Sequence, residues 1–515
     1  MIHRVGSRAV LVDLPDLGTV MAWHAALTTA PLQGQVDVIA AARTILVTTN
    51  SPRAAARAAQ ELRTFSPPGV DKQAADEVSI DVVYDGADLH VAAELAGMSP
   101  AALIDWHTSQ QWRGAFGGFA PGFTYCVPAD PARALDIPRR ESPRTEVPAG
   151  AVGLAGDFSA VYPRQSPGGW QLIGTTVTPM WDSSAQPPAL IAPGDSVHYR
   201  AVREHVTLSR AESAAADFSA PARPVLQVAD PGLLTLVQDL GRPGHGNLGV
   251  TESGAADRAS ARAANAAVGN PSGAAVLENI GGLELTALVD TVVAVTGARS
   301  AVTVEDRPVE LGNAVLLSSG DTLHVEAPSL GLRSYVAVRG GLVDTPVLGS
   351  QATDVLSGLG PRAITGGVVS AGPAPRGAAA TRVSNPLRVT EREGTTHAEL
   401  RCVPGPREDW FLAGMEALTR QVWQVSGQSN RVGLRLEGEP LERGRTGELA
   451  SEGIVAGSVQ IPANGLPVVF LRDHPVTGGY PVVATVLAED LDIAAQLPPG
   501  GTVSFLPVDP ESRDT

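Results

Sequence analysis

The chain has 515 residues, of which 43% are hydrophobic, 18% are charged and 4% are aromatic. This length is enough for about three or four domains. Its 38 basic and 54 acidic residues give a net charge of −16, which repels a polyphosphate backbone and speaks against a nucleic-acid partner. Lys72 is the only lysine, so the sequence excludes a GxxxxGK[ST] phosphate-binding loop, a plausible Schiff-base lysine and a lysine carrying covalent biotin.

The cysteines and the N-terminal sequence indicate in which cellular compartment the protein is expected. Cys126 and Cys402 lie far apart and form neither a CxxC pair nor a ligand cluster, so we expect no disulfide framework and no zinc site. Residues 1–14 lack the apolar core of a signal peptide, and no stretch reaches the ~18 apolar residues of a membrane span. We therefore expect a cytoplasmic protein with no membrane partner.

The first 85 residues alternate between strand and helix patterns. Strands are predicted at Ala9–Leu14 and within Gln35–Thr49, and helices at Thr19–Thr29 and Arg53–Phe65. This alternation predicts a small α/β lobe over 1–85.

The pattern of predicted secondary structure changes after Val78–Tyr84. Helices are predicted at Leu89–Leu95 and Pro100–Gln110, and short runs broken by Gly and Pro continue to Tyr199. We expect a β-barrel or sandwich over 86–208. Residues 209–224 are rich in Ala, Ser and Pro and are predicted to be a linker between two fused units.

The second unit is predicted to be mainly β, in two lobes over 225–380 and 381–515 that divide within Pro373–Ser384. One helix is expected at Gly254–Val268. The whole chain is thus expected to be mainly β with a minor α/β part. Predicted strands are Val292–Thr296, Thr322–Ala327, Arg333–Val338, Glu399–Val403, Val468–Leu471 and Thr502–Leu506.

Glycine and aromatic residues are densest in three segments of the first unit: Phe116–Tyr125, Pro143–Gly156 and Tyr162–Gly174. Glycines let backbone N–H groups approach a ligand, and Phe, Tyr and Trp supply flat walls, which together predict a pocket rim. The alternative is that Gly and Pro turn the corners of a barrel while the aromatic residues fill its core.

Three polar residues of the first unit, His107 and the pair Arg144 and Glu146, are candidates for a chemical role. His107 precedes the glycine-rich segment and is a candidate general acid or base, although a lone histidine on an amphipathic helix is more often a packing or surface residue. Arg144 and Glu146 would face the same side of a strand. They form either an ion pair or part of a clamp for a carboxylate or phosphoryl group.

The second unit concentrates polar residues in glycine-rich stretches. Residues 235–257 contain Gln238, Asp239, Arg242, His245 and Asp257. Such a set is more than a turn needs and suits a small polar or anionic substrate, although Asx turns remain an alternative.

Further polar residues follow at 429–435, 451–453, Gln460 and 473–480. His245 and His474, with the nearby aspartates, match no metal-ligand spacing, so we expect no metal bound by these residues.

These motifs resemble the B and C subunits of 5-oxoprolinase, a family also described as allophanate hydrolase subunits one and two and as kinase-inhibitor-type proteins. The resemblance covers nearly the whole chain except the linker and the two tails. It rests in the first unit on Gly118–Tyr125, Pro143–Arg144, Val147–Gly150 and Ser166–Gly174, and in the second on Val237–Arg242, Ser253–Gly254 with Asp257, Ala264–Asn265, Val268–Asn270, Ser429–Arg431, Ser451–Gly453 and Thr477–Pro481.

Few positions depart from the family pattern. Ala151 stands where the first of these proteins usually has Ser, Ser159–Tyr162 replaces a usual Thr-Gly-Ile-Tyr, and Thr175 replaces a common Arg. These departures concern the details of the first pocket, including which anion it holds.

The resemblance implies tandem cyclophilin-like β-barrel domains with a small N-terminal α/β lobe. The implied activity is ATP-dependent opening of 5-oxo-L-proline to L-glutamate, and the implied partner is a separate 5-oxoprolinase A subunit. ATP with Mg is the implied cofactor, held by this chain or mainly by that partner, and homo-oligomerisation is left open. The related urea carboxylase uses biotin, which this chain does not carry covalently.

As a hypothesis for the site, arginines hold the substrate carboxylate or phosphate, glycine N–H groups form an anion cradle, and an acid–base group handles the water. The arginines are Arg144, Arg242 and Arg431. The acid–base candidates are His107, Asp239 and Asp473. The remaining substrate-binding candidates are Gly118 and Gly122 within Gly117–Gly122, Trp170, Gln238, Asn430, Gly478 and Gly479.

Two other functions stay open at this point. One is a component of a biotin-dependent carboxyltransferase of the urea amidolyase type, served by a biotin carrier from elsewhere. The other is a binding module that inhibits a histidine kinase, which needs only a docking surface.

Overall fold

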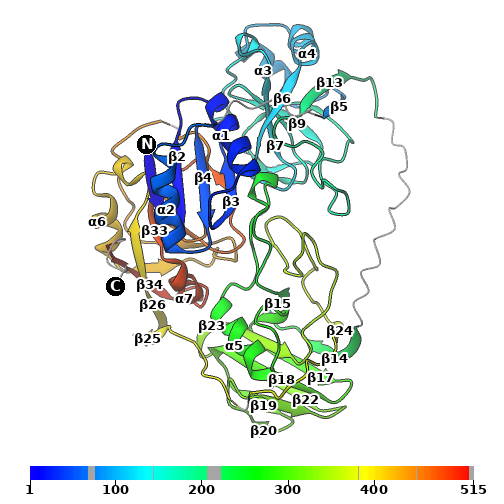
Figure 1. Ribbon diagram of the computed structural model, residues 1–515, viewed down its shortest axis with the longest axis vertical. Helices are drawn as coiled ribbons and strands as arrows, with labels where there is room; N and C mark the ends of the chain where they lie inside the picture. The colour runs from blue at the N-terminus through cyan, green and yellow to red at the C-terminus, as the bar shows by residue number, and fades with distance from the viewer. Residues whose placement is uncertain (68–75, 143, 206–221, 381, 448, 510–515) are drawn as a thin grey trace.

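The computed structural model describes residues 1–67, 76–142, 144–205, 222–380, 382–447 and 449–509 (Figure 1). Lys72 and residues 209–221 of the predicted linker lie outside these ranges. The last two predicted linker residues, 223 and 224, belong to strand β14 (Arg223–Asp230).

The N-terminal lobe is a four-stranded sheet in the order β1-β2-β4-β3, covered on one face by two helices. Asp16 caps the first helix by accepting a hydrogen bond from the N–H of Thr19, and Ser51 caps the second through Ala54. This lobe confirms the predicted strand and helix alternation. Its elements are β1 (Ile2–Val5), β2 (Ala9–Asp13), α1 (Leu17–Thr29), β3 (Gln35–Ala40), β4 (Thr44–Thr49) and α2 (Pro52–Leu62).

The opposite face of this sheet is also covered. Leu11, Ile39 and Leu46 pack in one cluster with Val476 of the C-terminal part of the chain. Figure 1 shows the blue lobe lying against the orange and red strands. Burial on both faces explains why β2 and β4 read as continuous apolar runs rather than as alternating ones.

The first barrel has seven strands in the order β12-β9-β10-β7-β6-β13-β5. Reciprocal hydrogen bonds between Val83 and Thr175 join its two ends, so the sheet closes. Because β5 pairs with β13, the barrel begins before the predicted boundary at 85/86. Its strands are β5 (Glu77–Val82), β6 (Trp112–Gly117), β7 (Thr124–Pro128), β9 (Ala151–Ala155), β10 (Phe158–Val161), β12 (Gln171–Thr175) and β13 (Ser196–Ala201).

Four further elements accompany this barrel. Strands β8 (Arg144–Val147) and β11 (Ser166–Gly168) form a separate pair, and helices α3 (Leu89–Leu95) and α4 (Pro100–Thr108) pack beside the barrel wall. Both helices lie where the sequence predicts them, with α4 ending two residues earlier.

The middle lobe consists of a six-stranded and a five-stranded sheet that share one apolar core. Its helix, α5 (Arg258–Val268), begins later than predicted because Ser253 and Gly254 adopt left-handed backbone with φ of 53° and 87°. The six-stranded sheet contains β14, β17 (Leu283–Ala287), β19 (Val302–Val304), β20 (Arg307–Pro308), β22 (Thr322–Val325) and β24 (Gly367–Ala371). The other contains β15 (Leu234–Gln238), β16 (Val276–Ile280), β18 (Thr291–Arg299), β21 (Val315–Leu317) and β23 (Leu330–Val338).

The second barrel closes because β26 pairs with β33 on one side and with β34 on the other. A short strand, β25 (Thr390–Arg392), is added at its edge, and α6 (Gly414–Thr419) and α7 (Leu491–Ala494) accompany it. Its strands are β26 (Thr395–Pro404), β27 (Trp423–Val425), β28 (Gly433–Glu437), β30 (Ser458–Gln460), β31 (Val468–Phe470), β33 (Val482–Val486) and β34 (Thr502–Pro507); β29 (Glu452–Gly453) and β32 (Thr477–Gly478) pair separately.

The two barrels repeat one plan. The order β12-β9-β10-β7-β6-β13-β5 recurs as β33-β30-β31-β28-β27-β34-β26, and each barrel has one parallel pair, between its first and last strands. Even a side-chain contact recurs: Nε1 of Trp112 donates to the carbonyl of His107, and Nε1 of Trp423 donates to that of Leu418. The mainly β fold with two barrels is thus confirmed.

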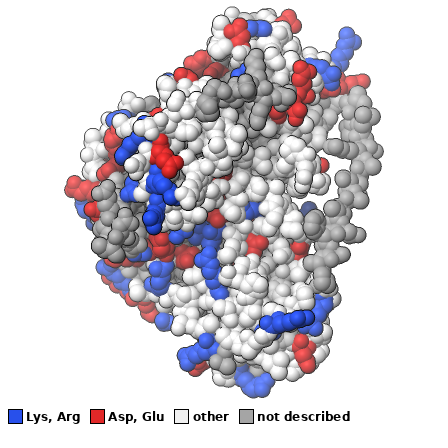
Figure 2. Space-filling model, in the orientation of Figure 1, with Lys and Arg blue, Asp and Glu red and all other residues white. Residues whose placement is uncertain are grey.

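The described surface has no large region of one charge on the face seen in Figure 2, where basic and acidic side chains are interspersed. Among the described helices, none is long and apolar enough to cross a membrane.

Candidate functional site

The glycine-rich hairpin of the first barrel touches the second barrel. The N–H of Phe119 donates to Oγ1 of Thr477 at 3.3 Å. A Cβ atom on Gly118 would lie 2.5 Å from the same oxygen, so only glycine permits this approach. Phe119 itself has a φ of 61°, an uncommon conformation for a residue with a side chain. Gly118 thus lies against Thr477, the residue before Gly478, where the two barrels meet.

The loop at residues 243–250, between β15 and α5 of the middle lobe, completes this junction. The N–H of Gly122 donates to the carbonyl of Leu248 at 3.1 Å. The N–H of Gly246 donates to Oδ2 of Asp37 in the N-terminal lobe at 2.7 Å. Residues 243–250 thus bind both the first barrel and the N-terminal lobe, and three parts of the chain converge here.

The aromatic residues beside the hairpin are packed rather than exposed. Phe123 makes edge-on contacts with Tyr162 and Trp170 at centroid distances of 5.1 and 5.5 Å. Trp170 and Tyr125 are buried as well. Burial raises the pKa of Tyr125, while hydrogen bonds with Ser451 and Thr477 act in the opposite sense. The aromatic cluster therefore supports the hairpin from within, and Tyr125 reaches toward the second barrel.

Arg144 has an internal partner. Its two terminal nitrogens donate to the two carboxylate oxygens of Asp88, each at 2.8 Å, and Arg140 adds a third contact at 2.8 Å. Asp88 also accepts from the N–H of Leu172. The carboxylate clamp predicted for Arg144 is thus occupied by Asp88, which lies just before α3.

His107 lies inside the first barrel's core. It is 0% exposed, its Nδ1 lies 2.7 Å from the hydroxyl of Tyr84, and its Nε2 lies 2.9 Å from Oγ of Ser159. Burial lowers the pKa of His107 to about 3. Because α4 turns this side chain into the barrel core, the structure favours the packing alternative, and the acid–base role stays a prediction.

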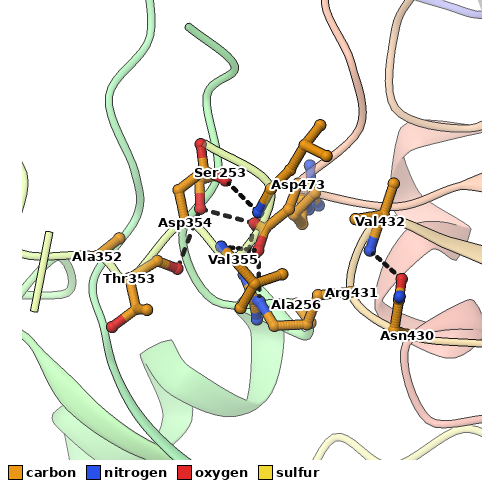
Figure 3. A network of polar contacts seen from close by, with 12 residues as sticks. Ser253, Ala256, Ala352, Thr353, Asp354, Val355, Asn430, Arg431, Val432 and Asp473 are labelled. Carbon is orange, nitrogen blue, oxygen red and sulfur yellow. Dashed lines mark hydrogen bonds and ion pairs between the residues drawn. The ribbon is translucent and has the colours of Figure 1, made fainter. Parts of the chain in front are cut away.

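Arg431 and Asp473 form the centre of a buried network (Figure 3). Nε and Nη2 of Arg431 donate to the two carboxylate oxygens of Asp473, both at 2.9 Å. The guanidinium also pairs with Glu278 and donates to the carbonyl of Gly254. Asp473 accepts further bonds from Oγ of Ser253 at 2.7 Å and from the N–H of Val355 at 3.0 Å.

This network gives two predicted site residues internal partners. Arg431 is 2% exposed and Asp473 is 0% exposed, and their polar atoms are taken up by one another and by the middle lobe. They join the second barrel to the middle lobe, and their contact with substrate stays a prediction. Asn430 is exposed beside them and accepts a bond from the N–H of Val432, an Asx turn.

Gln238, Asp239 and Arg242 hold the long segment that follows β23. Nε2 of Gln238 donates to the carbonyl of Thr353 at 2.8 Å. Asp239 accepts from Oγ of Ser350 at 2.6 Å and from the N–H of Gln351 at 2.7 Å. Arg242, which is buried, donates to the carbonyls of Val347 and Ala352. These side chains position a loop, and substrate contact by the buried Arg242 stays a prediction.

A cavity of about 420 Å³ lies at the same junction. Its walls come from the N-terminal lobe, residues 243–258 and the second barrel. A volume of this size is typical of small-molecule sites. Its charged and polar lining residues include Arg8, Asp37, Thr251, Glu252, Arg258, Arg472 and His474.

Sequence reasoning did not single out Arg258 and Arg472. Each directly adjoins a motif that it did single out: Arg258 follows Asp257, and Arg472 precedes Asp473. Arg472 and Asp473 lie in the turn after β31, where no strand alternation tells the two side chains apart in the sequence. Among the described residues, no group of three His, Cys, Asp or Glu side chains is arranged to hold a metal ion.

The structure therefore defines a class of protein: two fused units, each with a closed seven-stranded barrel, that share one junction and one cavity. The family model for carboxyltransferase domain, subdomain C and D, matches residues 1–191, and that for subdomain A and B matches residues 248–507. The chain belongs to this carboxyltransferase domain family.

Curated relatives match the two units separately. The 5-oxoprolinase C subunit of Escherichia coli K12 is 36% identical over 288 residues, 55% of this chain and 91% of that protein. The 5-oxoprolinase B subunit of Escherichia coli O157:H7 is 34% identical over 213 residues, 40% of this chain and 97% of that protein. Urea amidolyase of Lachancea kluyveri is 28% identical over 55% of this chain but only 17% of its own length. The resemblance to the B and C subunits is thus confirmed.

A solved structure matches the whole chain. The crystal structure of TTHA0988 superposes with a TM-score of 0.83 at 32% identity, covering 97% of this chain and 100% of that one. The Kluyveromyces lactis urea amidolyase matches 55% of this chain and 19% of its own, with a TM-score of 0.51 at 28% identity.

Proposed function

We propose that this chain is the fused B and C component of an ATP-dependent 5-oxoprolinase, which opens 5-oxo-L-proline to L-glutamate together with a separate A subunit. The observation that carries the proposal is the junction: relatives named as the B and C subunits of 5-oxoprolinase match consecutive parts of the chain, and Phe119 of one part binds Thr477 of the other. A site built from both units explains why the two are useful in one chain.

The reaction sets clear demands on the protein. A five-membered lactam is a stable amide, so water attacks it only after its carbonyl oxygen is activated, and phosphorylation by ATP with Mg supplies that activation. The protein must then stabilise an anionic oxygen and deliver water. Since the sequence has no phosphate-binding lysine loop, a nucleotide is held by arginine and backbone N–H groups here, or by the A subunit.

The residues that remain candidates for substrate contact lie at the junction. Gly478 and Gly479 follow Thr477 at the contact between the barrels. Gly118 and Gly122 lie at the same contact with their N–H groups bonded to the carbonyls of Phe123 and Leu248, and Trp170 supports the hairpin from behind. His474 and Asp37 line the adjoining cavity and replace His107 and Asp473 as groups able to accept a proton there.

The test is release of glutamate and ADP from 5-oxo-L-proline, ATP and Mg²⁺ by the purified chain with its cognate A subunit. Release that requires both proteins supports the proposal. Hydrolysis at the same rate by the isolated A subunit would remove the chain from the reaction.

A second candidate is the carboxyltransferase component of a urea amidolyase-like system. The family description and the similarity to urea amidolyase favour it. It requires a biotin carrier from another protein, so transfer of a carboxyl group from added carboxybiotin to urea, without glutamate release, would select this candidate over the first.

A further inference from the structure

The cavity at the junction is lined by two guanidinium groups that are incompletely hydrogen-bonded. Arg472 is 9% exposed, and the side chain of Arg258 is 13% exposed. Arg258 contacts Glu252 at 3.1 Å and donates to the carbonyl of Ser253, while Arg472 contacts Asp492 at 3.5 Å. Among the described residues, neither Nε atom has a hydrogen-bond partner.

Unpartnered buried N–H groups on a cation are costly, and the two charges also oppose each other. Burial, and next the neighbouring Arg258, lower the pKa of Arg472 to about 10. A bound anion beside the two guanidinium groups would relieve this repulsion, since guanidinium groups hold carboxylates with directed, charge-assisted bonds.

The rest of the lining offers acceptors. Nδ1 of His474 lies 2.8 Å from the carbonyl of Pro475, so that nitrogen carries the proton, and Nε2, 3.5 Å from the hydroxyl of Thr251, keeps its lone pair. Burial lowers the pKa of His474, which keeps the ring neutral. Asp37 already accepts from two N–H groups, and burial raises its pKa to about 6. These groups suit a ligand that carries N–H or O–H donors beside its anionic end.

The charges facing the cavity limit what the anion can be. Arg258, Arg472 and the exposed Arg8 at its edge are opposed by Glu252 and Asp37, and Arg472 and Arg8 also contact Asp492 and Glu489 at 3.5 and 3.6 Å. Positive charge is therefore not in excess, so a monoanion fits better than a phosphate with two or three charges.

We propose that this cavity binds a small organic monocarboxylate, whose carboxylate is held by Arg258 and Arg472 and whose remaining polar atoms contact His474 and Asp37. The proposal that this ligand is 5-oxo-L-proline, a monocarboxylate with one lactam N–H, rests on the proposed function. Carboxylate binding itself does not.

The test is isothermal titration calorimetry of the full chain in the absence of its partner protein, with 5-oxo-L-proline, the uncharged 2-pyrrolidinone and inorganic phosphate as separate probes. We expect 5-oxo-L-proline to bind at least tenfold more tightly than the other two. Arg472→Gln and Arg258→Gln should each weaken binding at least tenfold. Phosphate binding in preference to the carboxylate, or no binding of the carboxylate at millimolar concentration, would overturn the proposal.

Two further variants separate binding from folding. Ala456→Phe leaves every charge in place and fills the cavity from its wall, so it should abolish binding. Arg200→Gln removes an exposed arginine paired with Asp81 outside the cavity and should leave binding unchanged. Unchanged affinity in folded Ala456→Phe would contradict this location for the site.

Turnover measured in parallel distinguishes the two proposals. Binding without turnover in the presence of the A subunit would contradict the proposed function and leave the carboxylate site standing. Turnover whose KM for 5-oxo-L-proline is unaffected by Arg472→Gln and Ala456→Phe would contradict the site and leave the function standing.

Discussion

Arg431 donates two hydrogen bonds to the carboxylate of Asp473, in a place where neither side chain reaches solvent. The pair belongs to the second barrel, and the groups that complete its bonding, Glu278 and Ser253, belong to the middle lobe. Because each charge is buried with its partners, removing one leaves others uncompensated.

The first prediction concerns the stability that this pair provides. Arg431→Gln leaves the carboxylates of Glu278 and Asp473 buried without their cation, so we expect a loss of about 3–5 kcal/mol of unfolding free energy in urea denaturation. The matched control is Arg420→Gln, whose ion pair with Glu416 is 63% and 78% exposed and should contribute less than about 0.5 kcal/mol. Equal, small effects of the two variants would contradict the assigned role.

A second prediction follows from the enclosed His107. In His107→Phe the hydroxyls of Tyr84 and Ser159 lose their partner, so we expect about 1–3 kcal/mol of destabilisation at pH 7. Turnover per folded molecule should be unchanged, since this side chain does not reach the junction. A large fall in kcat with intact stability would restore His107 to the catalytic candidates.

The pH dependence of that variant has a definite sign. The pKa of His107 is about 3 in the folded chain and 6.5 when unfolded, so the unfolded state binds an additional proton between these values. The wild type therefore loses stability relative to His107→Phe as the pH falls from about 6.5 toward 3, by up to about 1.4 kcal/mol per pH unit. Denaturation curves of both proteins at pH 7 and pH 5 measure this difference, and a constant gap would contradict it.

The contact between the barrels gives a third prediction. Gly118→Ala places a methyl group 2.5 Å from Oγ1 of Thr477, and its cost should be about 1–3 kcal/mol. Thr477→Ala in the same chain should recover most of this cost, because the obstructing oxygen is gone. Gly427→Ala, where nothing lies within 4 Å of the added methyl, is the control. Additive effects of the Gly118 and Thr477 changes would show that the two residues do not meet.

The fourth prediction concerns the loop held by Asp239. Asp239→Ala removes the acceptor for the N–H of Gln351 and the hydroxyl of Ser350. We expect hydrogen exchange at Gln351 to accelerate at least tenfold, with core strands such as β23 unchanged. Unaltered exchange at Gln351 would contradict the conclusion that Asp239 holds this loop in place.

The sequence predicted secondary structure better than it predicted roles of polar residues. Helix α3 and the strands of the N-terminal lobe follow from periodicity, which is a local signal. The closure of each barrel cannot be predicted from such local signals, because the pairs β5–β13 and β26–β34 join strands more than a hundred residues apart.

Polar residues in a motif are equally able to contact a ligand or to hold the fold. Arg144, Arg431 and Asp473 were expected to meet substrate, and all three are satisfied by internal partners that are distant in sequence, such as Asp88 for Arg144. Arg472 shows the reverse case. It stands beside Asp473 in the turn after β31, yet it lines the cavity while Asp473 is buried against Arg431.

The central claim is that both units of this chain act together with the A subunit on 5-oxo-L-proline. The most direct measurement is the stoichiometry of glutamate to ADP formed by the purified chain, by its partner protein, and by both together, with saturating ATP, Mg²⁺ and 5-oxo-L-proline. The account predicts that the mixture releases one glutamate for each ADP and that neither protein alone releases glutamate. No glutamate from a stable complex of the two, or equal release by the partner protein alone, would contradict it.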